Sequence, residues 1–162
     1  MIEIRPIQQS EVPEAKRVIF TVAFEVFREA STLEESIAKY SAQGKLSEMD
    51  DVQKNYFENG GTFLVTVDDG RIIGTGAIRW LEEGVCELKR MWLLTEYHGQ
   101  GLGYRMMQEL FAIARNMGYK VIRLETDRVV QTRAVNFYRK LGFYEIPRFG
   151  DDPDDMGMEM TL

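Results

Sequence analysis

Cysteine and histidine are almost missing from this 162-residue chain, which contains one of each, Cys86 and His98. One cysteine excludes an internal disulfide, and the two residues together are too few for a tetrahedral zinc site. They also form no plausible Cys/His nucleophilic pair. The sequence therefore predicts neither a metal centre nor a covalent thiol mechanism.

Long apolar runs are lacking as well, since no window approaches the roughly 20 apolar residues of a membrane span. The N-terminal stretch MIEIRPIQQSEV has neither the basic start nor the apolar core of a signal peptide. We therefore expect a cytoplasmic protein with no membrane partner.

Positive charge is in short supply, because 20 Lys and Arg stand against 26 Asp and Glu, a formal net charge of −6. Nucleic-acid binding relies on basic side chains that neutralise phosphates, so no nucleic-acid partner is expected. An acidic protein suits a cationic ligand instead. The apolar fraction of 44% and the absence of low-complexity tracts predict one folded domain over residues 1–162.

Hydrophobic spacing predicts helices in the first third of the chain and a sheet-rich remainder. Helices are expected over 10–29, 33–42, 49–58, 102–117 and 132–141, the first with Ser10 as cap and Pro13 in its opening turn. Strands are expected over 2–7, 62–67, 72–81, 85–94, 121–126, 143–146 and 156–162. The apolar face expected for the helix over 102–117 consists of Leu102, Met106, Leu110, Ile113, Ala114 and Met117. The predicted fold class is α/β, with helices flanking a mixed sheet of about seven strands.

A glycine-rich turn follows the strand over 85–94 and opens the next helix. Gly99, Gly101 and Gly103 let the main chain approach a bulky anion and adopt φ/ψ values closed to other residues. The helix that begins near Leu102 directs unpaired N–H groups at the same place. The turn is therefore predicted to bind a diphosphate through its backbone.

The spacing around the turn narrows the choice of nucleotide. No Lys-Ser/Thr pair follows Gly103, as the GxxxxGK[ST] loop of ATP- and GTP-binding proteins requires. The glycines fall as GxGxG and not GxGxxG, and they lie past the middle of the chain, which disfavours NAD and FAD.

Residues 98–103, His-Gly-Gln-Gly-Leu-Gly, match the pattern [Gln/Arg]-x-x-G-x-[Gly/Ala]. This resembles the acetyl-CoA-binding signature of the GNAT superfamily of N-acetyltransferases. The segment from Gln131 to Phe143 resembles the family's downstream helix, N-x-x-A-x-x-x-Y-x-x-x-G-F. The resemblance covers about residues 70–143. His98 stands in place of the usual Gln or Arg, which is expected to weaken ligand binding and not to abolish it, because backbone amides supply most phosphate contacts in the family. Gln131 stands in place of the usual Asn and puts less in doubt, because it keeps an amide.

The resemblance implies acetyl-CoA as co-substrate. Its diphosphate would lie over the turn, its pantetheine arm would pair with the backbone of the preceding strand as an added strand does, and the downstream helix would contribute further contacts. The implied binding residues are Met91, Trp92, Leu93, His98, Gly99, Gln100, Gly101, Leu102, Gly103, Gln131 and Arg133. Arg139 is a weaker candidate for a phosphate contact.

The family transfers the acetyl group directly to an amine, whose pKa near ~10.4 means that a proton must first be removed. Glu87 stands where the protein-acetylating branch of the family carries a catalytic glutamate, although it can equally be one of many surface carboxylates. Glu125 is the reserve base.

Tyr138 stands where the family keeps a tyrosine that gives a proton to the departing CoA thiolate. A phenol near pKa ~10 is a weaker acid than a thiol near ~8.5, so Tyr138 would assist by hydrogen bonding unless the site lowers its pKa. Otherwise it is a core tyrosine. A catalytic role for His98 is disfavoured, because its side chain is expected to face the pyrophosphate or solvent.

The acceptor is expected to be a primary amine, more readily a small molecule than a protein. The aspartates between 151 and 155 form either a solvated turn or an acidic lip that attracts the amine. Exposed strand edges near the C-terminus favour a homodimer. Two other functions stay open: a non-catalytic sensor of acyl-CoA, and a transferase for longer acyl chains.

Overall fold

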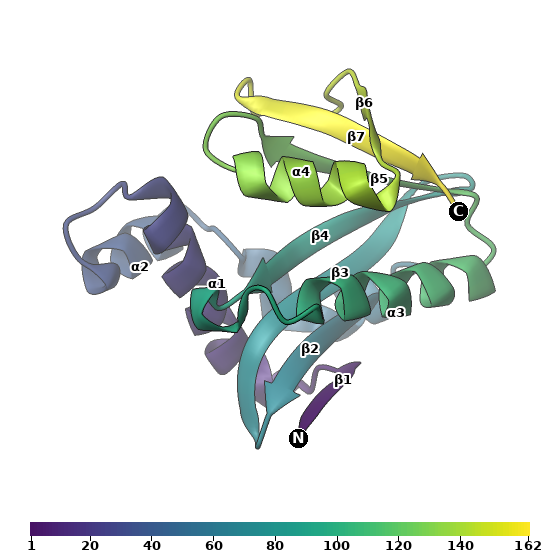
Figure 1. The fold of residues 1–162 in the computed structure, drawn as a ribbon. Coiled ribbons are helices and arrows are strands. Elements are labelled where there is room, and N and C mark those ends of the chain that lie inside the picture. Colours follow the sequence, from purple (N-terminus) through teal and green to yellow (C-terminus); the bar gives the residue numbers. More distant parts are fainter.

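In the computed structural model, which describes all 162 residues, seven strands form one sheet in the order β1-β2-β3-β4-β5-β7-β6 (Figure 1). The strands are β1 Ile2–Pro6, β2 Thr62–Asp68, β3 Arg71–Glu82, β4 Val85–Leu93, β5 Val121–Asp127, β6 Tyr144–Ile146 and β7 Asp155–Thr161. The helices are α1 Val12–Phe27, α2 Leu33–Ala42, α3 Leu102–Asn116 and α4 Thr132–Leu141. Neighbouring strands are antiparallel except β4 and β5. The predicted α/β class with a mixed, mostly antiparallel seven-stranded sheet is confirmed.

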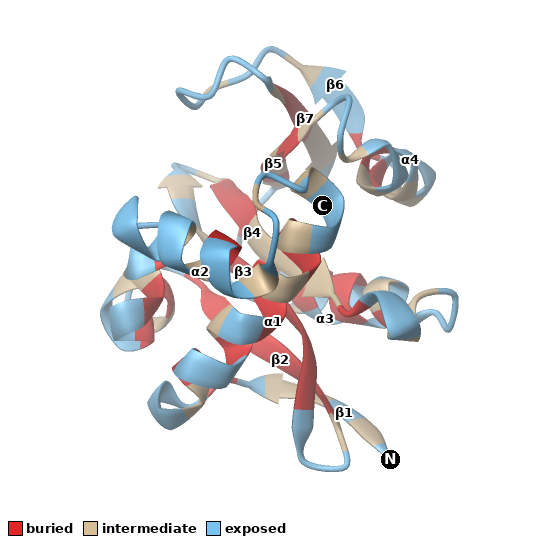
Figure 2. Cartoon of the chain, turned by 90° about the vertical axis from the view of Figure 1, so that its left-hand side faces the viewer, coloured by how far each residue is buried: buried red, intermediate tan, exposed pale blue.

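Helices cover both faces of the sheet and enclose two apolar cores. α1 packs with β2 and β3 in one core, and α3 and α4 pack with β4, β5 and β7 in the other. The centre of the sheet is accordingly buried, while α2 is mostly exposed (Figure 2). The helical spacing of α3 is confirmed over most of its length, but Met117 is 48% exposed because the helix has ended at Asn116.

The first third of the chain differs from expectation at two places. Ser10 is not a cap: α1 begins at Val12 after a 3-10 turn, where Gln8 and Glu11 form a capping box. Residues 49–58 are not an α-helix but a 3-10 turn, Ser47–Asp51, followed by a single π-helical turn, Gln53–Phe57. A long-range contact accompanies this irregular segment, because Glu48 in the 3-10 turn accepts a hydrogen bond from Arg90 of β4.

The parallel pair β4 and β5 holds together over only three residue pairs, from Val85 with Val121 to Glu87 with Arg123. β5 then continues beside β7, and β4 continues beside β3 alone, so the two strands diverge (Figure 1). Past this point β4 has a β-bulge, where Arg90 adopts a φ of +54°. The edge of β4 that faces β5 is therefore without a strand partner from Leu88 onward.

Candidate active site

The glycine turn lies at the end of this unpartnered edge and leads directly into α3. Gly99 and Gly101 have φ values of +82° and +78°, as the sequence predicts. The first backbone bond of α3 runs from the Arg105 N–H to the Gly101 carbonyl, 3.0 Å, so the N–H groups of Leu102 and Gly103 have no intrahelical acceptor. The turn therefore presents free N–H groups at a helix N-terminus, which suits an anion.

Gly103 differs from the other two glycines. It lies in the first turn of α3 and has no positive φ, so the expectation of an unusual backbone conformation is wrong here. A Cβ at this position would meet Phe137 Cζ at 3.5 Å and Met91 Cε at 3.9 Å, both ordinary contacts.

Two side chains of the turn, those of Leu102 and His98, pack against the protein, whereas Gln100 is exposed. Leu102 is 4% exposed and belongs to the core under α1. The His98 ring turns back on β4, where Nε2 lies 3.0 Å from the Leu93 carbonyl and Nδ1 is buried without a partner. A carbonyl only accepts, so Nε2 carries the proton. The expectation that His98 faces pyrophosphate or solvent is wrong, because the ring packs against its own strand end.

The side chains at the end of β4 pack against different cores on the two faces of the sheet. Met91 packs against the core of α3 and α4, and Trp92 and Leu93 pack against the core under α1. The Thr75 hydroxyl donates to the Arg90 carbonyl at 2.6 Å and ties the bulge to β3. What this segment offers to a ligand is consequently its backbone edge.

Gln131 and Arg133 stand at the start of α4. Gln131 Oε1 accepts hydrogen bonds from the Thr126 hydroxyl, 3.0 Å, and from the Asp127 N–H, 3.1 Å. The amide oxygen thus closes the turn between β5 and α4. Arg133 is exposed.

Glu87 lies at the last paired position before β4 and β5 part. Cys86 and Leu88 belong to the core of α3 and α4, so the alternation of the strand turns Glu87 to the other face. Glu87 is 8% exposed, and its Oε1 accepts a hydrogen bond from Arg79 Nε at 3.2 Å.

Tyr138 lies on the opposite face, in the core of α3 and α4, and is 7% exposed. Its ring packs against those of Phe137 and Phe143, each with a centroid separation of 5.5 Å. Burial raises the pKa of the Tyr138 phenol, so the sequence-based option of a lowered pKa is wrong. Burial likewise raises the pKa of the Cys86 thiol to about 12. The two predicted catalytic residues thus lie on opposite faces of the sheet.

Four charged residues of this site were missed by the sequence analysis: Glu48, Arg79, Lys89 and Arg90. Glu48 binds Arg90 through two hydrogen bonds, 2.7 and 3.0 Å, and accepts a third from the Tyr56 hydroxyl, 2.7 Å. Burial raises the pKa of the Glu48 carboxyl, but Arg90 outweighs it and the pKa lies below its ordinary value. The period of two along β4 could have placed Lys89 on the face of Glu87, whereas nothing in the sequence indicates the bulge at Arg90.

Glu125, the reserve base, is engaged elsewhere. Its Oε2 accepts hydrogen bonds from the N–H groups of Phe149, 3.0 Å, and Gly150, 2.9 Å, and so anchors the loop between β6 and β7. Asp155 lies at the end of this loop. Burial and the charges of Asp152 and Glu125 raise the pKa of Asp155 to about 6.

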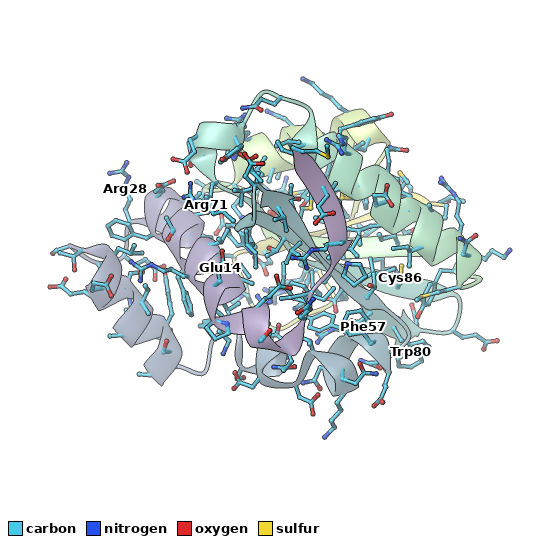
Figure 3. All side chains as sticks on the ribbon, turned by 90° about the horizontal axis from the view of Figure 1, so that it is seen from below. Glu14, Arg28, Phe57, Arg71, Trp80 and Cys86 are labelled. Atoms are coloured by element: carbon cyan, nitrogen blue, oxygen red, sulfur yellow. The ribbon has the colours of Figure 1, made fainter.

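A separate cavity of about 380 Å³ lies between α1, the start of β3 and residues 94–96. Glu14 and Arg71, both labelled in Figure 3, are among its lining residues. It contains none of the residues that the sequence analysis predicted for the site.

Residues 29–143, well over half of the chain, match the family model described as Acetyltransferase (GNAT) family. The chain belongs to the GNAT acetyltransferase family. Its matched region includes the glycine turn, the β4–β5 divergence and α4, and its domain is accordingly of the acyltransferase class.

The alignments with curated GNAT relatives cover only part of each relative's length. The chain is 32% identical over 101 residues to the uncharacterized N-acetyltransferase YjgM of Escherichia coli (strain K12). This alignment covers 60% of this chain and 60% of that protein. It is 36% identical over 104 residues to the IAA acetyltransferase of Azospirillum brasilense, 62% of this chain and 67% of that protein. The chain spans about half to two-thirds of the length of such relatives.

Solved GNAT structures share the fold over their whole length. An acetyltransferase of Staphylococcus aureus Mu50 superposes with a TM-score of 0.83 at 20% identity, covering 100% of this chain and 99% of that one. The PaiA N-acetyltransferase of Thermoplasma acidophilum, in complex with coenzyme A, gives 0.77 at 24% identity with the same coverage. None of the four α-helices of this chain combines the length and apolar character needed to cross a bilayer.

Proposed function

We propose that this chain is an N-acetyltransferase that moves an acetyl group from acetyl-CoA directly to a primary amine of a small molecule. The observation that carries the proposal is the divergence of β4 from β5 directly after Glu87, with the glycine turn at the end of the same strand. A pantetheine arm along the free edge of β4 would bring its diphosphate to the free N–H groups around Gly101 and its thioester toward Glu87. The coenzyme A bound to the Thermoplasma relative supports this choice of ligand.

The acceptor amine arrives protonated, and the carboxylate of Glu87 takes its proton. The amine nitrogen then attacks the thioester carbonyl, so that a C–N bond forms, the C–S bond breaks and the nitrogen releases its second proton to solvent. Arg79 binds one carboxylate oxygen of Glu87 and orients it, and the other oxygen has no hydrogen-bond donor within the chain. Direct transfer also agrees with Cys86, whose buried and protonated thiol is a poor nucleophile.

CoA departs as a thiolate, and Tyr138 donates a hydrogen bond to the sulfur as its charge develops. The raised pKa of the phenol makes full proton transfer unfavourable, so the proton on the released thiol comes from solvent.

The test is CoA release from acetyl-CoA with a panel of amino acids, polyamines, aminoglycosides and N-terminal peptides. Glu87→Gln is expected to lower kcat by about 10²-fold, and Tyr138→Phe by about tenfold, with unchanged CoA affinity by calorimetry. Tyr144→Phe, at an exposed tyrosine on β6, serves as the matched control and should leave kcat unchanged. Tight CoA binding with transfer to no amine would instead favour the acyl-CoA sensor.

A further inference from the structure

Lys89 is the one cation of this chain that is neither exposed nor ion-paired. Five other lysine and arginine side chains are withdrawn from solvent, and each pairs with a carboxylate: Arg5, Lys16, Arg79, Arg90 and Arg123. Lys89 is half-buried on β4, with no ion pair or hydrogen bond of its own. The fold thus supplies a counter-ion to every other sheltered cation and leaves this ammonium without one.

The position of Lys89 connects it to the site. It lies two residues after Glu87 on β4, and therefore on the same face, just past the last β4–β5 pair. Figure 1 shows the two strands diverging there. The ammonium stands beside this divergence on the face from which an acceptor would reach Glu87.

The neighbouring charges do not neutralise Lys89. Glu87 is bound to Arg79, and Glu48 is bound to Arg90, so three cations share two carboxylates. Burial, followed by the charge of Arg90, lowers the pKa of Lys89 more than Glu87 and Glu48 raise it. The local environment thus disfavours the charged form of Lys89, and an arriving anion would favour it.

We infer that Lys89 is a specificity residue that binds a carboxylate of the acceptor, which is therefore an amino acid or a similar small molecule carrying both an amine and a carboxylate. The inference rests on the proposed acetyl transfer and names the substrate class of the same site. It predicts an anion-binding wall on β4.

Beyond Arg123, whose charge is paired with Glu82 and Glu159, the side of the divergence formed by β5 has the opposite charge. Ile122 and Leu124 of β5 belong to the core of α3 and α4, so Glu125 and Asp127 alternate to the face of Lys89. Asp155 of β7 is the cross-strand partner of Asp127. A cation on one wall and carboxylates on the other are complementary to a ligand that carries both charges.

The test compares each of several α-amino acids with its amide and its decarboxylated amine, by steady-state kinetics. The wild type should show a kcat/KM at least about tenfold higher for the carboxylated member, as a charge-assisted hydrogen bond predicts. Lys89→Gln should lose this preference through KM, with kcat little changed. Lys89→Arg should retain most of it, and Lys120→Gln, at an exposed lysine before β5, is the matched control.

Equal kcat/KM values within each wild-type series, or an unchanged preference in Lys89→Gln, would overturn the inference. So would a tenfold weaker binding of CoA by Lys89→Gln, because the lysine would then serve the donor. Calorimetric titration of the CoA complex with the amino acids needs no turnover. If no amine is acetylated, the proposed function fails. Amino-acid binding to the wild type that is lost in Lys89→Gln would still support the carboxylate site. No amino-acid binding to the wild type would reject that site.

Discussion

The carboxylate of Glu48 holds a strained residue in place. Arg90 has a left-handed φ of +54°, which costs a non-glycine residue about 1–2 kcal/mol. Two hydrogen bonds from its guanidinium to Glu48 offset that strain, and the Tyr56 hydroxyl fixes the carboxylate in turn. The bulge that frees the edge of β4 therefore depends on an ion pair with a residue far away in the sequence.

Glu48→Gln should lower the free energy of unfolding by about 2–3 kcal/mol at pH 7, because the guanidinium loses its counter-charge while sheltered from water. The folded-state pKa of Glu48 lies below its ordinary 4.5, so its contribution is complete above that value and is lost as the pH falls through the folded pKa. Urea denaturation at pH 7 and pH 3 measures both values. Glu34→Gln, which removes an exposed pair with Arg17, should cost less than about 0.5 kcal/mol. An equal loss at both pH values would contradict this role.

At the scale of the element, the first turn of α3 is the part of the helix that contributes to the proposed CoA site. Its N-terminus has free N–H groups because Gly101 enters the helix in a left-handed conformation that aims the turn at the end of β4. Gly101 and Gly103 therefore contribute differently: one provides the backbone conformation, and the other leaves room beside Phe137 and Met91.

Gly101→Ala should lower stability by about 1 kcal/mol, because alanine resists a φ of +78°, and should weaken CoA binding at least about tenfold. Gly103→Ala should raise stability by up to about 1 kcal/mol, because alanine favours a helix and its Cβ makes only ordinary contacts, with CoA affinity within a few-fold of wild type. Thermal unfolding and calorimetry measure the pair. Equal effects of both substitutions would refute the distinction.

For the whole molecule, β4 and β5 form the shortest junction between interior strands of the sheet, with three residue pairs where β5 and β7 have seven. A ligand along the edge of β4 would supply contacts that the sheet itself lacks at that junction. The outer strands of the sheet are β1 and β6, and a homodimer through such an edge stays a prediction.

CoA should therefore stabilise the protein and protect this junction. At a hundredfold excess over Kd, the gain is about 2.7 kcal/mol, visible as a higher Tm. Hydrogen exchange should slow at residues 88–93 and 99–104 together. ATP at the same concentration is the control and should leave residues 88–93 unchanged. Protection limited to 99–104 with CoA would show that only the diphosphate is held.

Local signals in the sequence determined the elements that carry the site. α2 and α4 have the predicted bounds, because Thr32 caps one and Gly142 ends the other with a positive φ. The glycine turn before α3 was also predictable from local sequence, because a glycine determines the backbone conformation at its own position. The two family motifs lie in these local segments and indicated acetyl-CoA.

Only the tertiary structure decided which side chains meet. The burial of Leu102, the bulge at Arg90 and the isolation of Lys89 depend on contacts between residues distant along the chain. No local pattern contains such contacts, because they form only when α1, the segment around Glu48 and β4 are packed together. The sequence therefore indicated the donor, and the arrangement of charges on the folded sheet led to an inference about the acceptor.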